Sequence, residues 1–114
     1  MAPKELREPT FLVLTALAAG PLHGYGLMQA VNVSTDGDVT LRPGTLYTAL
    51  DRLTVEGLVA IVGEETVDGR PRRYYELTEA GAAALAEAAA RLEARAQQAR
   101  AALASRPRRT VVTA

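Results

Sequence analysis

The segment 43–77 constrains the fold of this chain more than any other, because it joins a short amphipathic helix to a hairpin. In its first part, GTLYTALDRLTVEGL, leucines recur at helical spacing and form one apolar stripe. The stripe consists of Leu46, Leu50 and Leu53. Pro43 suits the first position of a helix and Gly57 suits its end, so the sequence predicts a helix between these two residues.

The next part, LVAIVGEETVDGRPRRYYEL, predicts two antiparallel strands, 58–65 and 71–77, with Asp68-Gly69 as the turn signal. The tip and the return strand contain Arg70, Arg72 and Arg73. A helix that fits a DNA major groove, followed directly by a basic hairpin, is the outline of a winged helix-turn-helix. The sequence therefore predicts a mainly α fold with a small β-hairpin wing.

Two further helices are expected before this segment. Pro9 and the pair Gly20-Pro21 bound an apolar helix over 9–19. A second helix is expected over 23–34, and Val39–Leu41 is expected to form a brief strand. Because the first helix is apolar almost all round, we expect a second subunit to cover one of its sides.

A long helix is expected after the hairpin, with Thr78 as its N-cap and an end near Leu103. Its apolar residues repeat at near-heptad spacing, and they are Leu85, Leu92, Ala99 and Leu103. A stripe of that length cannot be buried on so small a domain, so we expect it to pack against a partner copy. The predicted organisation is a winged-helix domain (1–77), a dimerisation helix (78–105) and a basic, disordered tail (106–114).

The composition excludes several classes of function. The chain has no cysteine, which removes disulfides and zinc-thiolate sites, and its single histidine, His23, cannot make a recognisable metal site. No nucleophile is paired with a base, and no glycine-rich phosphate loop is present. We therefore expect no enzyme, no cofactor and no metal. The absence of a long apolar run or a signal peptide predicts a cytoplasmic protein with no membrane partner.

Net charge is the main argument against a nucleic-acid partner, because thirteen basic residues balance thirteen acidic ones. DNA-binding domains usually carry an overall basic excess. Any affinity for DNA must therefore come from the local placement of arginines and from its duplication in an oligomer.

Three stretches closely resemble the PadR family of bacterial transcriptional regulators: PTFLVLTALAAGPLHGYGLMQAV, LRPGTLYTALDRLTVEGLV and GRPRRYYELTEAG. The resemblance covers about residues 9–90, and the single C-terminal helix resembles the family's small subclass. It implies a homodimeric winged-helix repressor that binds a palindromic operator and is often released by a small molecule. Some members hold flat drugs between tryptophans, and that mode cannot be carried over because this chain has no tryptophan.

The candidate DNA contacts lie on the outward face of the helix after Pro43, at its entrance and on the wing. They are Arg42, Thr45, Tyr47, Thr48, Arg52, Arg70 and Arg72. An arginine can bind guanine through two hydrogen bonds, and a threonine can meet a phosphate or a thymine methyl. The resemblance implies that Tyr47 contacts a phosphate. Arg73 points to the opposite strand face from Arg72, so we expect it to be structural.

A small apolar effector, or a plain dimer interface, is expected between the first and last helices. The residues proposed for it are Phe11, Leu14, Tyr25, Leu85 and Leu92. For the chain as a whole, the alternative to a DNA-binding regulator is a winged-helix protein-interaction module without specific DNA binding, which the neutral charge favours.

Overall fold

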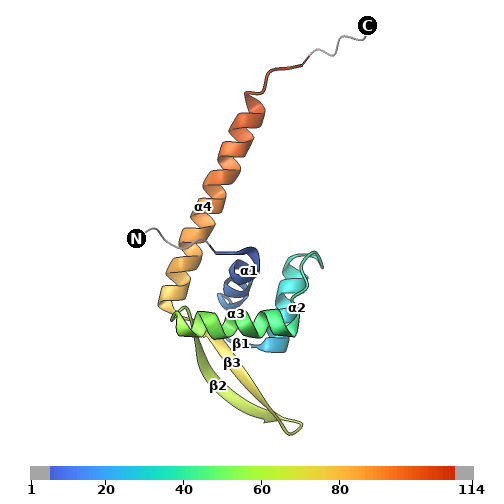
Figure 1. Cartoon of the computed structure of the whole chain (residues 1–114), viewed down its shortest axis with the longest axis vertical. Coiled ribbons are helices and arrows are strands. Elements are labelled where there is room, and N and C mark those ends of the chain that lie inside the picture. Colours follow the sequence, from blue (N-terminus) through green and yellow to red (C-terminus); the bar gives the residue numbers. More distant parts are fainter. Residues whose placement is uncertain (1–5, 110–114) are drawn as a thin grey trace.

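The computed structural model describes residues 6–109. Within this range the chain forms four helices and a three-stranded antiparallel sheet in the order β1-β3-β2 (Figure 1). The elements are α1 (Glu8–Leu17), β1 (Leu22–His23), α2 (Gly24–Ser34), α3 (Pro43–Val55), β2 (Val59–Val67), β3 (Arg70–Leu77) and α4 (Glu79–Ala104). The mainly helical fold with a β wing is the one predicted from the sequence.

One hydrophobic core joins α1, α2, α3 and the base of the wing. The leucine stripe of α3 is fully buried in it, as predicted from the helical period. The remaining core residues come from the other elements and include Val13, Leu14, Leu17, Leu27, Val31, Leu41, Val59 and Tyr75. The sheet therefore packs on the helices only at its base, and the hairpin extends beyond the core (Figure 1).

Local signals set the ends of α3 and the turn of the wing where the sequence predicted them. Gly57 has φ 77° and ends α3 in a conformation that favours glycine. The hairpin turns at Asp68 (φ 51°) and Gly69 (φ 77°), the two positive angles of a type I′ turn. The pairing of β2 with β3 shifts register between Ile61 and Gly63, which is a bulge that twists the wing.

The strand expected at Val39–Leu41 is not formed, and that prediction was wrong. The Thr35 hydroxyl accepts a hydrogen bond from the Val39 amide at 3.0 Å, which holds this segment as a loop, and Leu41 is buried without a strand partner. The third strand is instead β1, where Leu22 pairs with Tyr75 and His23 pairs with Tyr74.

Helix α4 leaves the body of the molecule on the side opposite to the wing (Figure 1). Its first turn is capped by the Thr78 hydroxyl, which accepts from the Gly81 amide at 3.0 Å as predicted. Only Gly81 and Ala88 of this helix are buried, whereas Leu92 and Leu103 are 49% and 65% exposed. Residues 106–109 have no regular secondary structure, and the rest of the predicted tail lies outside the described residues. None of the described helices has the length and apolarity needed to span a membrane.

Candidate nucleic-acid interface

The outward face of α3 is polar and accessible. Thr45, Thr48 and Asp51 are exposed, while Leu46 and Leu50 on the opposite face are fully buried. Val55, at the last turn, is 88% exposed. A helix with one side fixed in the core and short polar side chains on the other can enter a DNA groove without losing its packing.

Tyr47 lies at the border of this face, against the start of α2. Its phenol contacts Gly24 so closely that a Cβ at Gly24 would overlap the hydroxyl. The residue as a whole is nevertheless 46% exposed. Between Tyr47, Tyr25 and the wing runs an open groove of about 810 Å³. Its wall on the wing side includes Arg70 and Arg72. The groove therefore combines aromatic hydroxyls with guanidinium groups, which are both partners for phosphate oxygens.

The arginines of the wing differ in their surroundings. Arg70 lies opposite Val67 at the turn and is exposed. Arg73 lies opposite Glu64 and forms an ion pair with it, with 3.9 Å between Nε and Oε2. Because both side chains are more than half exposed, this pair contributes little to stability. Arg73 also lines the groove, together with Arg70 and Arg72, and differs from Arg70 in having a carboxylate partner.

Tyr74 stiffens the same strand through a hydrogen bond that its hydroxyl donates to Glu65 Oε1 at 2.6 Å. That hydrogen bond is the main reason why the pKa of Tyr74 lies above its usual value of 10.0. His23 packs edge-on against Tyr74 and stacks with Tyr25, and its Nδ1 accepts a hydrogen bond from the Gly26 amide at 3.1 Å. The histidine thus caps α2 and joins α2 to the wing.

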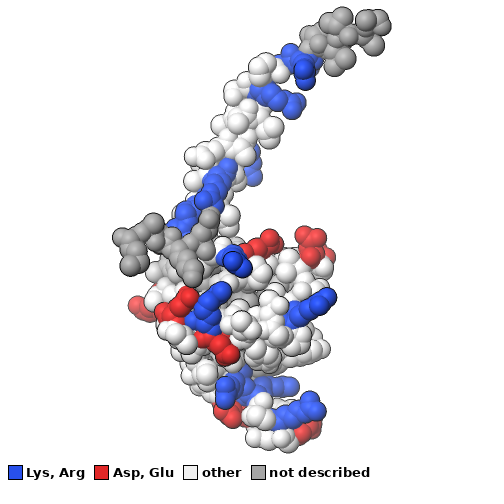
Figure 2. Space-filling model, in the orientation of Figure 1, with Lys and Arg blue, Asp and Glu red and all other residues white. Residues whose placement is uncertain are grey.

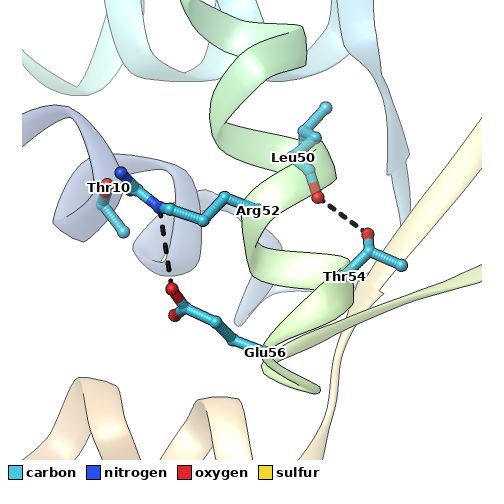
Figure 3. Close-up of polar contacts among 5 residues, drawn as sticks. All are labelled: Thr10, Leu50, Arg52, Thr54 and Glu56. Carbon is cyan, nitrogen blue, oxygen red and sulfur yellow. Dashed lines mark hydrogen bonds and ion pairs between the residues drawn. The ribbon is translucent and has the colours of Figure 1, made fainter.

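Arg52 lies on the α1 side of α3, away from the groove beside the wing. Its Nη2 donates a hydrogen bond to Thr10 Oγ1 at 2.8 Å, and its Nε lies 3.8 Å from Glu56 Oε1 (Figure 3). Thr10 is a buried residue of α1, only 3% exposed. The guanidinium that the sequence analysis assigned to a base is therefore bound to the protein itself in this structure.

Two arginines flank the entrance of α3. Arg42 is the N-cap residue, its carbonyl accepts a hydrogen bond from the Leu46 amide, and its exposed side chain makes no capping hydrogen bond. Arg7, which the sequence analysis did not select, is exposed and lines a second groove of about 380 Å³ between the first turn of α1 and α3. No local signal marks Arg7, because its proximity to α3 arises only from the fold.

Charge is distributed unevenly on the face shown in Figure 2. Basic side chains gather on the wing and follow the projecting part of α4, and acidic side chains lie close to those on the wing. The acidic neighbours on the wing are Glu64, Glu65 and Asp68. The chain thus has local basic surfaces although its net charge is zero. With no net charge, any affinity for DNA would depend on such local surfaces.

Comparison with known proteins identifies the family to which this fold belongs. Residues 13–87 match the model of the family described as "Transcriptional regulator PadR-like family". The chain belongs to the PadR-like family of transcriptional regulators. The prediction made from the three sequence stretches is confirmed, and the role of the family is regulation rather than catalysis.

Individual PadR relatives and neighbours agree with this assignment. "Transcriptional regulator Rv3488" of Mycobacterium tuberculosis is 43% identical over 75 residues, which are 66% of each chain, so the match spans just under two thirds of that relative. A PadR-family regulator from Eggerthella lenta has a TM-score of 0.68 and 26% identity, covering 86% of both chains. Bacillus subtilis PadR in complex with operator DNA has a TM-score of 0.64 and 18% identity, covering 95% of this chain and 54% of that one, and therefore supports the fold alone.

The five residues expected at an effector or dimer interface of this PadR protein do not lie together. Phe11 and Leu92 line the junction of α1 and α4, and Leu85 packs partly against the core. Leu14 is fully buried within the core of a single chain, and Tyr25 lies across the molecule in the groove beside the wing. The cavity between α1 and α4 measures only about 30 Å³. The helical period could not separate Leu14 from Phe11, because α1 is apolar on nearly every side.

Proposed function

We propose that this PadR-family regulator is a repressor that binds a palindromic operator as a homodimer. The observation that carries the proposal is the exposed polar face of α3 beside a groove whose opposite wall holds wing arginines. In this arrangement α3 lies in the major groove and the wing lies on the adjacent backbone or minor groove. Bacillus subtilis PadR, which shares the fold, was determined in complex with operator DNA, and we propose the same class of partner for this chain.

The proposed contacts divide into base contacts and backbone contacts. Thr45 and Thr48 meet base edges, because they are short, exposed and outward on α3. Backbone contacts come from the groove, the helix entrance and the wing, and the residues proposed are Arg42, Tyr47, Arg70 and Arg72. Arg52, which the sequence predicted as a base contact, is left out of this set because its guanidinium donates a hydrogen bond to Thr10.

The homodimer is supported by the apolar surface that α1 and α4 leave uncovered. Leu92 and Leu103 are about half and two thirds exposed on a helix that extends beyond the rest of the chain. Burying such a stripe against a second copy would bring two recognition helices to a spacing near one turn of DNA, about 34 Å. Two half-sites of an inverted repeat would then be bound together, and repression would follow because the dimer covers promoter DNA.

A small-molecule effector would need more room than one chain provides between α1 and α4. A drug-sized ligand needs a cavity of about 300 Å³ or more. One chain provides about 30 Å³ between α1 and α4. An effector site would therefore have to be completed by the partner chain, where ligand binding would change the angle between the two recognition helices.

A salt titration tests the DNA-binding function. The full-length protein is titrated against a fluorescent duplex from its own promoter region and against a scrambled duplex, between 50 and 300 mM salt, roughly the range in which such complexes weaken. With three or four phosphate contacts per subunit, log K against log salt should have a slope of about −6. A slope near zero on both duplexes would favour the protein-interaction module instead.

A further inference from the structure

The hydrogen bond between Arg52 and Thr10 adds a polar contact between α3 and α1, two helices that also contribute residues to the common hydrophobic core. The second groove, of about 380 Å³, lies between the first turn of α1 and the amino-terminal half of α3. Arg52 extends along this groove from the α3 side, and the Thr10 hydroxyl on the α1 side accepts a hydrogen bond from its guanidinium (Figure 3). The contact connects residues 42 positions apart in the sequence.

Three features hold the Arg52 side chain in this position. Its Nη2 donates to a hydroxyl that is buried, so water competes poorly for that oxygen. Its Nε faces Glu56, one turn further along α3, at 3.8 Å. Pro9 precedes Thr10 at the start of α1 and fixes the backbone there. A bidentate contact to guanine uses two N–H groups of the guanidinium, and here one N–H of Nη2 is donated to Thr10 while Nε faces Glu56, so fewer N–H groups are available to a base.

The packing partners of α1 determine which parts of the chain the Arg52–Thr10 hydrogen bond connects. Helix α1 packs against α2 and α4, and α4 carries the apolar stripe proposed for the dimer. Helix α3 carries the proposed base contacts. A bond from α3 to α1 therefore links the DNA-contacting helix to the part of the chain that sets the distance to a second copy.

We propose that Arg52 is a positioning residue, whose hydrogen bond to Thr10 fixes the orientation of α3 relative to α1 and α4. The inference rests on the proposed function, since it concerns how α3 is presented to DNA. Arg52 acts through Thr10 and contacts no base. It makes the protein selective for the spacing between half-sites rather than for a particular base pair.

Substitutions at Thr10 separate this role from base contact, because Thr10 is buried in the body and cannot touch DNA. Thr10→Val keeps the shape and removes the acceptor, whereas Thr10→Ser keeps the hydroxyl. Thr15→Val is the matched control, since Thr15 is exposed on the same helix and its hydroxyl bonds only to the Phe11 carbonyl. Urea unfolding of each variant establishes that the protein measured on DNA is folded.

The readout is binding to an operator selected by the wild-type protein, to single-base variants of it, and to operators with one base pair inserted between the half-sites. For Thr10→Val and for Arg52→Ala we expect the preference for the correct spacing to fall by a similar factor, on the order of tenfold, with the single-base preferences unchanged. The double variant should lose no more of the preference for the correct spacing than the single variant with the larger effect. Thr10→Ser and Thr15→Val should match the wild type.

Two results would overturn the inference. If Thr10→Val binds every operator as the wild type does while Arg52→Ala loses the preference at one base pair, Arg52 contacts that base. If the wild type selects no operator at all, the proposed function fails and this inference fails with it. The first result leaves the proposed function standing, so the two failures are distinguishable.

Discussion

Gly24 and Tyr47 show how a single missing side chain can position a candidate DNA contact. The Tyr47 phenol occupies the space where a Cβ of Gly24 would lie, and this places its hydroxyl beside the groove that faces the wing. Gly26, two residues along α2, has no such constraint, because the nearest atoms to its Cβ position are 3.5 Å away. The glycines of α2 therefore have different roles despite their similar sequence context.

For Gly24→Ala we expect a destabilisation of about 1–3 kcal/mol, because the added methyl must displace the Tyr47 ring. Affinity for DNA should fall as the hydroxyl moves. Gly26→Ala is the matched control and should stabilise the protein by about 0.5–1 kcal/mol, the usual gain of alanine over glycine within a helix. Urea unfolding measures both, and equal effects of the two substitutions would contradict this assignment.

Tyr75 should make the stability of the protein sensitive to alkaline pH. Burial raises the pKa of Tyr75 above its usual value of 10.0, so the folded state retains the proton that the unfolded state loses. The contribution of Tyr75 is thus complete below about pH 10 and is lost as pH rises through the folded pKa, by at most about 1.4 kcal/mol per pH unit. Tyr75→Phe should flatten the fall of unfolding free energy above pH 10, as measured by urea unfolding at several pH values, and an unchanged fall would contradict this role of Tyr75.

At the scale of elements, the start of α4 is fastened to the turn between α3 and β2. The Thr78 hydroxyl donates to the Gly57 carbonyl at 2.7 Å while it caps α4, and the Thr78 amide donates to the Leu58 carbonyl at 3.1 Å. Gly81 contacts the Leu58 carbonyl so closely that no side chain fits there. The direction of α4 is therefore set by the chain segment that ends α3.

Replacing Thr78 by alanine removes the cap of α4 and the hydrogen bond to Gly57 together. We expect a loss of about 1–2 kcal/mol in the free energy of unfolding, the upper part of the range for an N-cap. Ser105→Ala provides the comparison, since the Ser105 hydroxyl bonds only to carbonyls of its own helix at the far end of α4. Its effect should stay within about 0.5 kcal/mol. Similar losses for both would show that α4 is not anchored through Thr78.

The wing offers a matched pair of arginines for an electrostatic test. Arg70 is exposed at the turn, whereas Arg73 is paired with Glu64. Arg70→Ala should weaken binding to all DNA sequences alike and make the salt slope less steep by about 0.9 per subunit, while Arg73→Ala should change the slope little. The slopes come from anisotropy titrations at several salt concentrations. A larger change for Arg73 than for Arg70 would reverse the proposed orientation of the wing.

For the molecule as a whole, shape is the main argument for a dimer. The described part of the chain measures 73 × 35 × 21 Å, and α4 extends beyond the core along its long axis (Figure 1). An isolated helix with exposed leucines gains little from its own sequence in water. A second copy would cover this stripe and would also double the local basic surfaces of a chain with no net charge.

Leu92→Glu should therefore convert a dimer into a monomer. Sedimentation equilibrium should give twice the 12.1 kDa chain mass for the wild type and a single chain mass for the variant. Val33→Glu, at a 74% exposed position on α2, should remain dimeric. A wild-type protein that sediments as a monomer at micromolar concentration would contradict the proposed assembly.

Sequence reasoning succeeded where structure depends on local signals. The ends of α3, the turn at Asp68-Gly69 and the Thr78 cap are each encoded within a few residues, and each lies where it was predicted. It failed at β1, because a two-residue strand exists only through its pairing with Tyr74 and Tyr75, about fifty positions away. Strand pairing of that range leaves no periodic trace in so short a segment.

In the candidate site, too, the sequence predicted the features that depend on the local backbone and missed a contact between distant residues. The helical period correctly turned Thr45 and Thr48 outward, because short side chains follow the direction of their backbone. It could not place the end of Arg52, whose long side chain bends back to Thr10 on another helix. Helix α1 contains two hydroxyl residues, Thr10 and Thr15, and only the fold shows that Thr10 is the partner of Arg52.

The most direct test of the account is selection of binding sites by the full-length protein from a random pool of DNA duplexes. A dimer with two recognition helices should enrich an inverted repeat whose half-site centres lie about 10–10.5 base pairs apart. Enrichment of a single unpaired half-site, or of no sequence at all, would contradict the proposal that two copies of this chain bind one operator.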